Sequence, residues 1–227
     1  MNDRRLRILN RLAENSERSM DQLCGACKDV TELSGAGIML MFADVPLGSV
    51  GMTDAVSSLI EELQFTLGEG PCIDAYNLAQ PIAEPDLAFP TRHWLAFTPP
   101  ALDAGVRAIF SFPLQLGAVS LGALDLYRDD SGALTVDQHS DALVLASIVT
   151  EVVINMQSDA APGTLAAELT RVTEHRVVVH QAVGMVSVQL GVSVNEALIR
   201  LRAYAFGNSR QLDDVAGDVI ARRLRFE

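Results

Sequence analysis

The sequence predicts an α+β protein in which an antiparallel sheet sandwiched by helices is followed by an all-α module. Two β-rich apolar runs, 106–116 and 119–127, are separated by only two residues and predict adjacent antiparallel strands. Helical periodicity in 4–33 and 135–157 predicts a helix on either side of the strands, which favours a layered domain. In 164–227 every apolar pattern has helical spacing, so we expect only helices there.

The boundary between the two parts coincides with a change in charge. The 227-residue chain has a net charge of −12; residues 1–163 hold nine basic and 22 acidic residues (−13), whereas 164–227 carries +1. The segment that ends at Gly163 reads Ser-Asp-Ala-Ala-Pro-Gly, a composition typical of a linker. We therefore predict a first domain at 1–158, a linker at 159–163 and a second domain at 164–227.

Further strands and a helix are predicted before the hairpin. The compact apolar run at 36–42 predicts a buried strand, and 47–53 predicts a strand that pairs with it. Asp54 is expected to cap a helix that continues to about Phe65. Gly-Glu-Gly-Pro at 68–71 predicts a turn, because glycine adopts positive φ and proline fixes its own φ.

Proline and glycine interrupt two other stretches. From Pro71 to Pro100 prolines and polar residues break every period, apart from a short run near 81–83. The uncharged stretch 108–124 contains Pro113 and two glycines, so it suits a hairpin better than a membrane span. Three cysteines are too few for a disulfide framework. These features predict a soluble cytoplasmic chain with no membrane partner.

The second domain is predicted to be a three-helix module whose first helix is a coiled coil. Apolar residues alternate four and three apart along this helix, which favours a dimer seam over an ordinary core helix. The helix stops at Gly191, and Ser193 with Glu196 forms a capping box that opens the second helix. Ser209 is expected to cap the third. The predicted seam residues are Leu165, Leu169, Val172, Val179, Val183 and Val186.

Motifs for catalysis or metal binding are scarce. His175 and His180 are five residues apart, and a zinc-binding pair on a helix needs four. Cys72 is the residue with a candidate reactive role, because it follows the Gly-Pro turn where a helix N-terminus would stabilise a thiolate. An inert core thiol is the favoured alternative. No catalytic residue, metal site or cofactor is predicted.

Arginines are concentrated in the second domain. A guanidinium can pair with phosphate and stack on an unpaired base, as recognition of RNA loops requires. The alternative is a solvated helix surface with acidic partners, and the pattern alone favours it, because a charge of +1 is a small electrostatic footprint. The arginines concerned are Arg200, Arg202, Arg210, Arg222, Arg223 and Arg225.

Three motifs in the second domain resemble the ANTAR family. They are H-Q-A-V-G-M-V from His180, L-R-A-Y-A from Leu201 and L-D-D-V-A from Leu212. The similarity covers roughly 165–225. It implies a domain that binds tandem hairpin loops of leader transcripts as a homodimer and acts in transcription antitermination. Val183 departs from the pattern, since many members have lysine there.

The first domain resembles the GAF family. The residues that carry the similarity are L-G-E-G-P-C-I-D-A from Leu67, S-F-P-L from Ser111 and L-G-A-L-D-L from Leu121. The resemblance implies a sensor that encloses a small ligand between its sheet and the covering loops. It places Cys72 near the expected sensor pocket.

The two resemblances together predict a signal-responsive, non-enzymatic RNA-binding regulator. In this hypothesis the GAF domain senses a ligand or partner and the helix at 135–157 passes the signal to the ANTAR dimer. Two alternatives remain: a GAF-type thiol redox enzyme that uses Cys72, and a dimeric ligand-binding or partner-binding module without RNA activity. The predicted RNA-binding residues are Gln181, Arg200, Arg202, Tyr204, Ser209, Arg210, Arg222 and Arg223.

Overall fold

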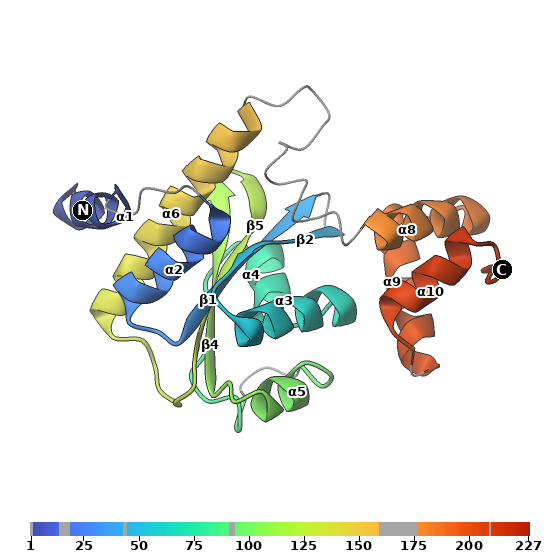
Figure 1. Ribbon diagram of the computed structural model, residues 1–227, viewed down its shortest axis with the longest axis horizontal. Coiled ribbons are helices and arrows are strands. Elements are labelled where there is room, and N and C mark those ends of the chain that lie inside the picture. Colours follow the sequence, from blue (N-terminus) through green and yellow to red (C-terminus); the bar gives the residue numbers. More distant parts are fainter. Residues whose placement is uncertain (1, 14–18, 43–44, 91–93, 159–176, 209) are drawn as a thin grey trace.

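Five strands form one antiparallel sheet, as expected for the first domain. The computed structural model describes residues 2–13, 19–42, 45–90, 94–158, 177–208 and 210–227 (Figure 1). Within these residues the strand order is β2-β1-β5-β4-β3. The strands are β1 (Gly35–Phe42), β2 (Val45–Met52), β3 (Ile82–Glu84), β4 (Ala108–Leu116) and β5 (Val119–Arg128).

Both predicted strand pairs are confirmed, and β5 joins them into one sheet. β1 pairs with β2, and β4 pairs with β5, in the antiparallel sense. β1 also pairs with β5, in a register that runs from Gly35 opposite Tyr127 to Leu40 opposite Gly122. The short run predicted near 81–83 is β3, which extends the sheet beyond β4.

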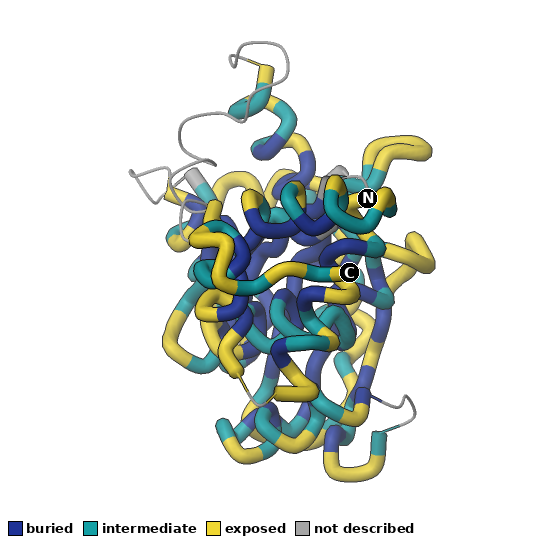
Figure 2. Tube along the Cα trace, turned by 90° about the vertical axis from the view of Figure 1, so that its right-hand side faces the viewer, coloured by how far each residue is buried: buried dark blue, intermediate teal, exposed yellow. Residues whose placement is uncertain are grey.

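Helices cover both faces of the sheet (Figure 1). One face packs against α2 (Met20–Thr31) and α6 (Val136–Ser158), and the other against α3 (Ala55–Leu67) and α4 (Pro71–Leu78). Asp54 caps α3 as predicted, since its carboxylate accepts the Ser57 amide N–H at 2.8 Å. Figure 2 shows the buried residues gathered between these layers.

The long first helix predicted at 4–33 is wrong: the described residues form α1 (Asn2–Ala13) and, separately, α2. Ser19 begins α2 with a capping box, in which its hydroxyl accepts the Gln22 amide at 3.2 Å and the Gln22 side chain accepts the Ser19 amide at 3.3 Å. A side chain that accepts hydrogen bonds from the first turn favours a helix start at that position. The apolar periodicity showed the buried face of each helix but missed this signal.

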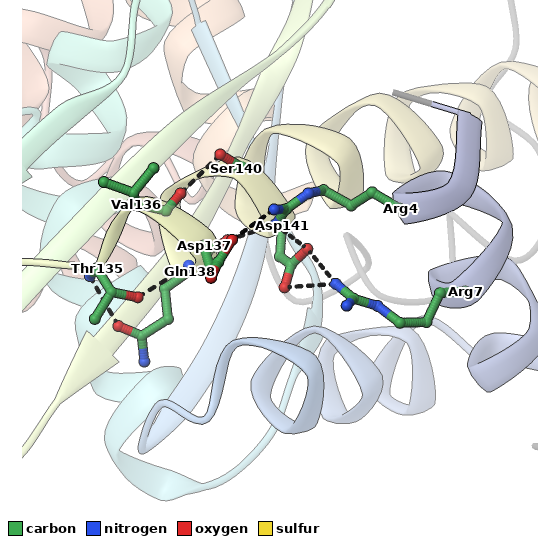
Figure 3. A network of polar contacts seen from close by, with 8 residues as sticks. All are labelled: Arg4, Arg7, Thr135, Val136, Asp137, Gln138, Ser140 and Asp141. Carbon is green, nitrogen blue, oxygen red and sulfur yellow. Dashed lines mark hydrogen bonds and ion pairs between the residues drawn. The ribbon is translucent and has the colours of Figure 1, made fainter.

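α1 is held against α6 by charged groups. Arg4 and Arg7 both bind Asp141, at 2.7 and 3.0 Å, and Arg4 also binds Asp137 at 2.6 Å (Figure 3). Ile8 is the residue of α1 that is fully buried in the core of this face. The N-terminal helix therefore lies on the α6 side of the sheet.

Two helices begin in the proline-rich stretch, where the sequence showed no helical period and offered only a candidate helix N-terminus at Cys72. α4 has Pro71 at its first position, and α5 (Thr98–Asp103) has prolines in its first turn. Proline is favoured at a helix start, because the missing N–H has no intrahelical partner there. These prolines begin helices. The turn before α4 uses Gly68 at φ 70° and Gly70 at φ 135°, as the Gly-Glu-Gly-Pro motif predicts.

The C-terminal module contains three helices within the described residues. They are α8 (Val177–Leu190), α9 (Val194–Gly207) and α10 (Leu212–Ile220), and each packs against the other two. Ser193 caps α9 as predicted, accepting the Glu196 amide at 3.2 Å. The prediction that Ser209 caps the third helix is wrong, because α10 follows Gln211. Ser209 itself lies outside the described residues.

α6 is apolar and long enough to cross a membrane by length and composition. Among the described residues, α8 and α9 would also qualify as a pair, although they bend by 105° where they meet. The apolar side of α6 packs on the sheet: Leu145 and Val149 are fully buried there. This packing is that of a core helix.

Candidate functional site

Two of the predicted RNA-binding arginines converge on one carboxylate of the C-terminal module. Arg210 binds Asp218 at 2.6 Å and Arg223 binds it at 2.7 Å. The hydrogen bonds from Arg210 and Arg223 lower the pKa of Asp218 and hold it ionised. Both arginines are exposed, so water screens these ion pairs and a phosphate can compete for either guanidinium.

Other predicted residues lie near a groove between α8 and α10. Gln181 lines this groove together with Ile220, and Arg222 follows Ile220 by two residues. Arg222 is exposed and has a left-handed backbone at φ 58°. Gln181 thus lines a groove to which α10 contributes Ile220, and Arg222 and Arg223 follow directly after the end of α10. The remaining residues of the groove are Gly184, Met185, Val188 and Gln189.

Arg200 and Tyr204 lie on α9. Arg200 is partly exposed and its Nε binds Glu196 at 2.9 Å, one helical turn earlier. Tyr204 is half-buried, and its ring packs edge-on against Phe226 with the ring centres 5.5 Å apart. Since Phe226 covers part of the Tyr204 ring, a base can reach only what remains exposed.

Arg202 is not on the open surface of the module, and the prediction that it is available to RNA is wrong for this arrangement. Its Nη2 donates to the backbone carbonyl of Phe65, near the end of α3 in the N-terminal domain. Its guanidinium carbon also lies 5.9 Å from the centre of the Phe65 ring. Burial lowers the pKa of Arg202 to about 10, and its Nε has no hydrogen-bond partner.

His180 makes a second contact between the two parts of the chain. Its Nε2 lies 3.2 Å from the carbonyl oxygen of Leu47 in β2. The imidazole ring also packs edge-on against Phe65, with centroids 6.2 Å apart. Phe65 is thus contacted by side chains from both α8 and α9.

The predicted dimer seam is wrong for the residues that the structure describes. Val179, Val183 and Val186 are fully buried and form the module's own core with α9 and α10. A heptad-like spacing cannot by itself distinguish a seam between two copies from a core within one chain, because both need an apolar stripe. The other seam residues, Leu165, Leu169 and Val172, lie outside the described residues.

A buried polar cluster lies under α3 in the N-terminal domain. The carboxylate of Asp125 accepts hydrogen bonds from the Ser111 hydroxyl and the Gln64 amide. Burial raises the pKa of Asp125 to about 6, although these two hydrogen bonds act in the opposite direction. Glu61 is buried beside Asp125, and burial together with the Asp125 charge raises its pKa well above the ordinary value.

Comparison with known proteins identifies both parts of the chain. The ANTAR domain model matches residues 167–220. The GAF domain of a phosphoenolpyruvate-protein phosphotransferase from Coxiella burnetii has a TM-score of 0.51 at 13% identity, covering 68% of this chain and 95% of that chain. The GAF domain of the Acinetobacter phosphoenolpyruvate-protein phosphotransferase gives 0.50 at 12% identity, with 70% and 96% covered. The chain thus combines a first domain of GAF fold with a C-terminal segment that matches the ANTAR domain.

A third structure resembles the first domain to a similar degree. A domain from Sinorhizobium meliloti 1021, described as part of a two-component sensor histidine kinase protein, has a TM-score of 0.52 at 14% identity and covers 62% of this chain and 91% of its own. No curated protein matches the sequence. The architecture therefore rests on the ANTAR motif and the GAF fold.

Cys72 of the GAF domain is a buried thiol. Its side chain is fully buried at the start of α4, and its backbone N–H donates to Gln64 Oε1 at 2.7 Å. Burial, and then the charges of Asp125 and Glu61, raises the pKa of the thiol well above its ordinary value. The expectation that the helix N-terminus stabilises a thiolate is therefore wrong, and the inert core thiol is the better interpretation.

Glu61, Gln64 and the role of Asp125 were not predicted from the sequence. A signal was present: an aspartate inside the apolar run of β5 cannot face a packed core without polar partners. No such rule identifies the partners, because Gln64 is 61 residues away along the chain. The position of Arg202 had no local signal either.

Proposed function

We propose that this GAF–ANTAR chain is a signal-responsive RNA-binding regulator that acts by transcription antitermination on tandem hairpin loops of leader transcripts. The ANTAR domain indicates RNA-binding antitermination regulation, and the GAF-type fold supplies a sensor domain. The observation that carries the proposal is the group of exposed arginines that follows α10, the helix that contributes Ile220 to the groove lined by Gln181.

The chemistry of these residues suits single-stranded RNA loops. Arg222 and Arg223 can neutralise phosphates, and each phosphate contact releases a bound counterion. Gln181 has an amide that both donates and accepts, so it can pair with the edge of an unpaired base. Antitermination would follow if the bound chain stabilises hairpins that exclude a competing terminator.

The test is RNA selection with the full-length chain. A pool of tandem hairpins with randomised loops is passed over the protein at low salt, and affinities for the enriched RNA are measured by fluorescence anisotropy across a salt series. We expect Arg222→Ala to weaken binding about tenfold and to reduce the salt slope by about 1, as loss of one phosphate contact should.

Arg11→Ala is the matched control. Arg11 is an exposed arginine on α1 of the GAF domain, so this substitution removes the same charge far from the module. We expect it to leave both the affinity and the salt slope unchanged. Equal effects of the two substitutions, or no enrichment by the wild-type chain, would contradict the proposal.

The thiol redox alternative is disfavoured by the burial of Cys72. A nucleophilic cysteine needs a populated, accessible thiolate. We expect Ellman's reagent to leave Cys72 unmodified in the native chain, and fast single-site modification would revive the alternative. That the regulator is a cytoplasmic homodimer stays a prediction, which light scattering and cell fractionation test.

A further inference from the structure

The guanidinium group of Arg202, a residue of the ANTAR domain, lies at the C-terminal end of the GAF helix α3. No basic residue lies in the last turn of α3, although a cation there would be stabilised by the helix dipole. Arg202 occupies this position from outside the GAF domain, donating to the Phe65 carbonyl. Gly68, the left-handed C-cap of α3, lies so close that a Cβ atom there would be 2.4 Å from Arg202 Nη1.

The contact extends over more than one side chain. His180 from α8 contacts both Phe65 and the Leu47 carbonyl, while α9 packs against β2. The buried apolar side chains of the α3 side of the GAF domain and of the ANTAR helices form one continuous cluster. Figure 1 shows the ANTAR helices beside the outer ends of α3 and β2. The two domains are thus packed together.

The partners of Arg202 are uncharged. Its guanidinium is paired with a carbonyl and an aromatic ring, and no carboxylate is among these partners. Removing a cation from water without a paired anion costs free energy, and the unpartnered Nε adds to the cost. Arg202 therefore has a weaker hold on the GAF domain than a buried ion pair would give. A phosphate would be a stronger partner for it.

α3 also contacts the buried polar cluster of the sensor. Gln64 precedes Phe65 and uses its amide for both Asp125 and the Cys72 backbone. A change in this cluster that moves Gln64 would move the carbonyl that receives Arg202. The helix therefore connects the interior of the GAF domain to the docked ANTAR domain.

We propose that α3 holds the ANTAR domain in a closed, autoinhibited position by docking Arg202 and His180, and that a signal in the GAF core releases them for RNA. The inference rests on the proposed RNA-binding function and adds its regulation. In the closed position Arg202 contacts the GAF domain and is withheld from RNA; in the open position its guanidinium is free to bind phosphate.

The test compares the same substitution at two glycines, one at the docking contact and one remote from it. Gly68→Leu places a bulky, uncharged side chain where Arg202 docks. Gly117→Leu is the control, because Gly117 has a similar φ of 61° and its Cβ would meet open space in the β4–β5 turn. Both substitutions carry the same left-handed backbone strain, so they differ in the contact with Arg202.

We expect Gly68→Leu to bind the selected RNA about tenfold more tightly than the wild type, a change of about 1.4 kcal/mol. Its radius of gyration in small-angle scattering should increase, and hydrogen exchange should speed up in the last turn of α3. Gly117→Leu should match the wild type in all three measurements. Circular dichroism checks that both variants are folded.

A second pair of variants acts from the ANTAR side. His180→Ala removes the contacts with Leu47 and Phe65, whereas His139→Ala removes an aromatic contact of similar size with Phe112, remote from the ANTAR helices. We expect His180→Ala to increase the radius of gyration and the exchange of α3, and His139→Ala to change neither. If Gly68→Leu does not fold, this pair of variants still tests whether the ANTAR domain docks on the GAF domain.

The outcomes separate the inference from the function on which it rests. If the docking variants open the chain but all variants bind RNA equally, autoinhibition is wrong and RNA binding stands. If scattering shows that neither docking variant opens the chain, the contact does not hold the domains and the inference is wrong. If no variant binds any RNA, the proposed function fails and the autoinhibition fails with it.

Discussion

The two faces of the GAF sheet are covered in different ways. The face under α2 and α6 is sealed by apolar side chains such as Leu145 and Phe112, and its charged groups lie at the rim, where α1 attaches. The face under α3 and α4 contains the buried cluster around Asp125 and continues into the ANTAR domain. A packed apolar layer resists local change, whereas a buried polar cluster responds to protonation or to a new partner. The difference suggests that the first face gives stability and the second carries the signal.

The largest expected effect is on the apolar face. Leu145→Ala should lower the free energy of unfolding by about 3 kcal/mol, because it leaves a cavity in a fully buried layer. Leu143→Ala is the matched control on the same helix, at a side chain that is 45% exposed, and should change stability by less than about 0.5 kcal/mol. Urea unfolding measures both. Comparable losses in the two variants would show that this face is not a tightly packed layer.

The second expected effect is a pH dependence of folding stability, which originates in the buried polar cluster around Asp125. Burial raises the pKa of Asp125 to about 6, from an unfolded value near 4, so the native state holds a proton that the unfolded state releases between these values. Stability should therefore be greatest below pH 4 for this group and should fall as pH rises to about 6. The raised pKa of Glu61 extends the loss to higher pH.

Glu61→Gln tests whether the buried carboxyl groups cause this pH dependence, because it replaces an ionisable side chain with a neutral one of similar shape. Between pH 5 and pH 8 the wild type should lose more stability than this variant, because burial raises the pKa of Glu61. Glu62→Gln, one residue further along α3 and only partly buried, should keep the wild-type slope. Identical slopes in all three proteins would mean that the buried pair does not titrate in this range.

The smallest effect concerns the charged rim of the apolar face. Asp141→Asn weakens the ion pairs with Arg4 and Arg7 and should cost about 1 kcal/mol, with faster hydrogen exchange in α1 (Figure 3). Asp137→Asn, at an exposed carboxylate that pairs with Arg4 alone, should leave urea unfolding unchanged. If the exchange of α1 is unaffected by Asp141→Asn, its attachment depends on Ile8 and other apolar contacts.

Local signals predicted much of the secondary structure. The cap at Asp54, the cap at Ser193 and the two neighbouring β-rich runs that gave the β4–β5 hairpin are each local features of the sequence. The errors arose where two structures share one local pattern. The apolar stripe of Val179 suited both a dimer seam and a core, and a proline such as Pro71 suited both a break and a helix start.

The sequence by itself determined the division into an acidic GAF domain and an arginine-containing ANTAR module, because composition, caps and motifs are local properties of the chain. Only the tertiary structure decided which long-range partners meet. It placed β5 beside β1, Gln64 on Asp125, and Arg202 on the Phe65 carbonyl 137 residues away. The physical reason is that the surroundings of an arginine depend on the packing of the whole chain: the same guanidinium binds phosphate when exposed and a carbonyl when docked.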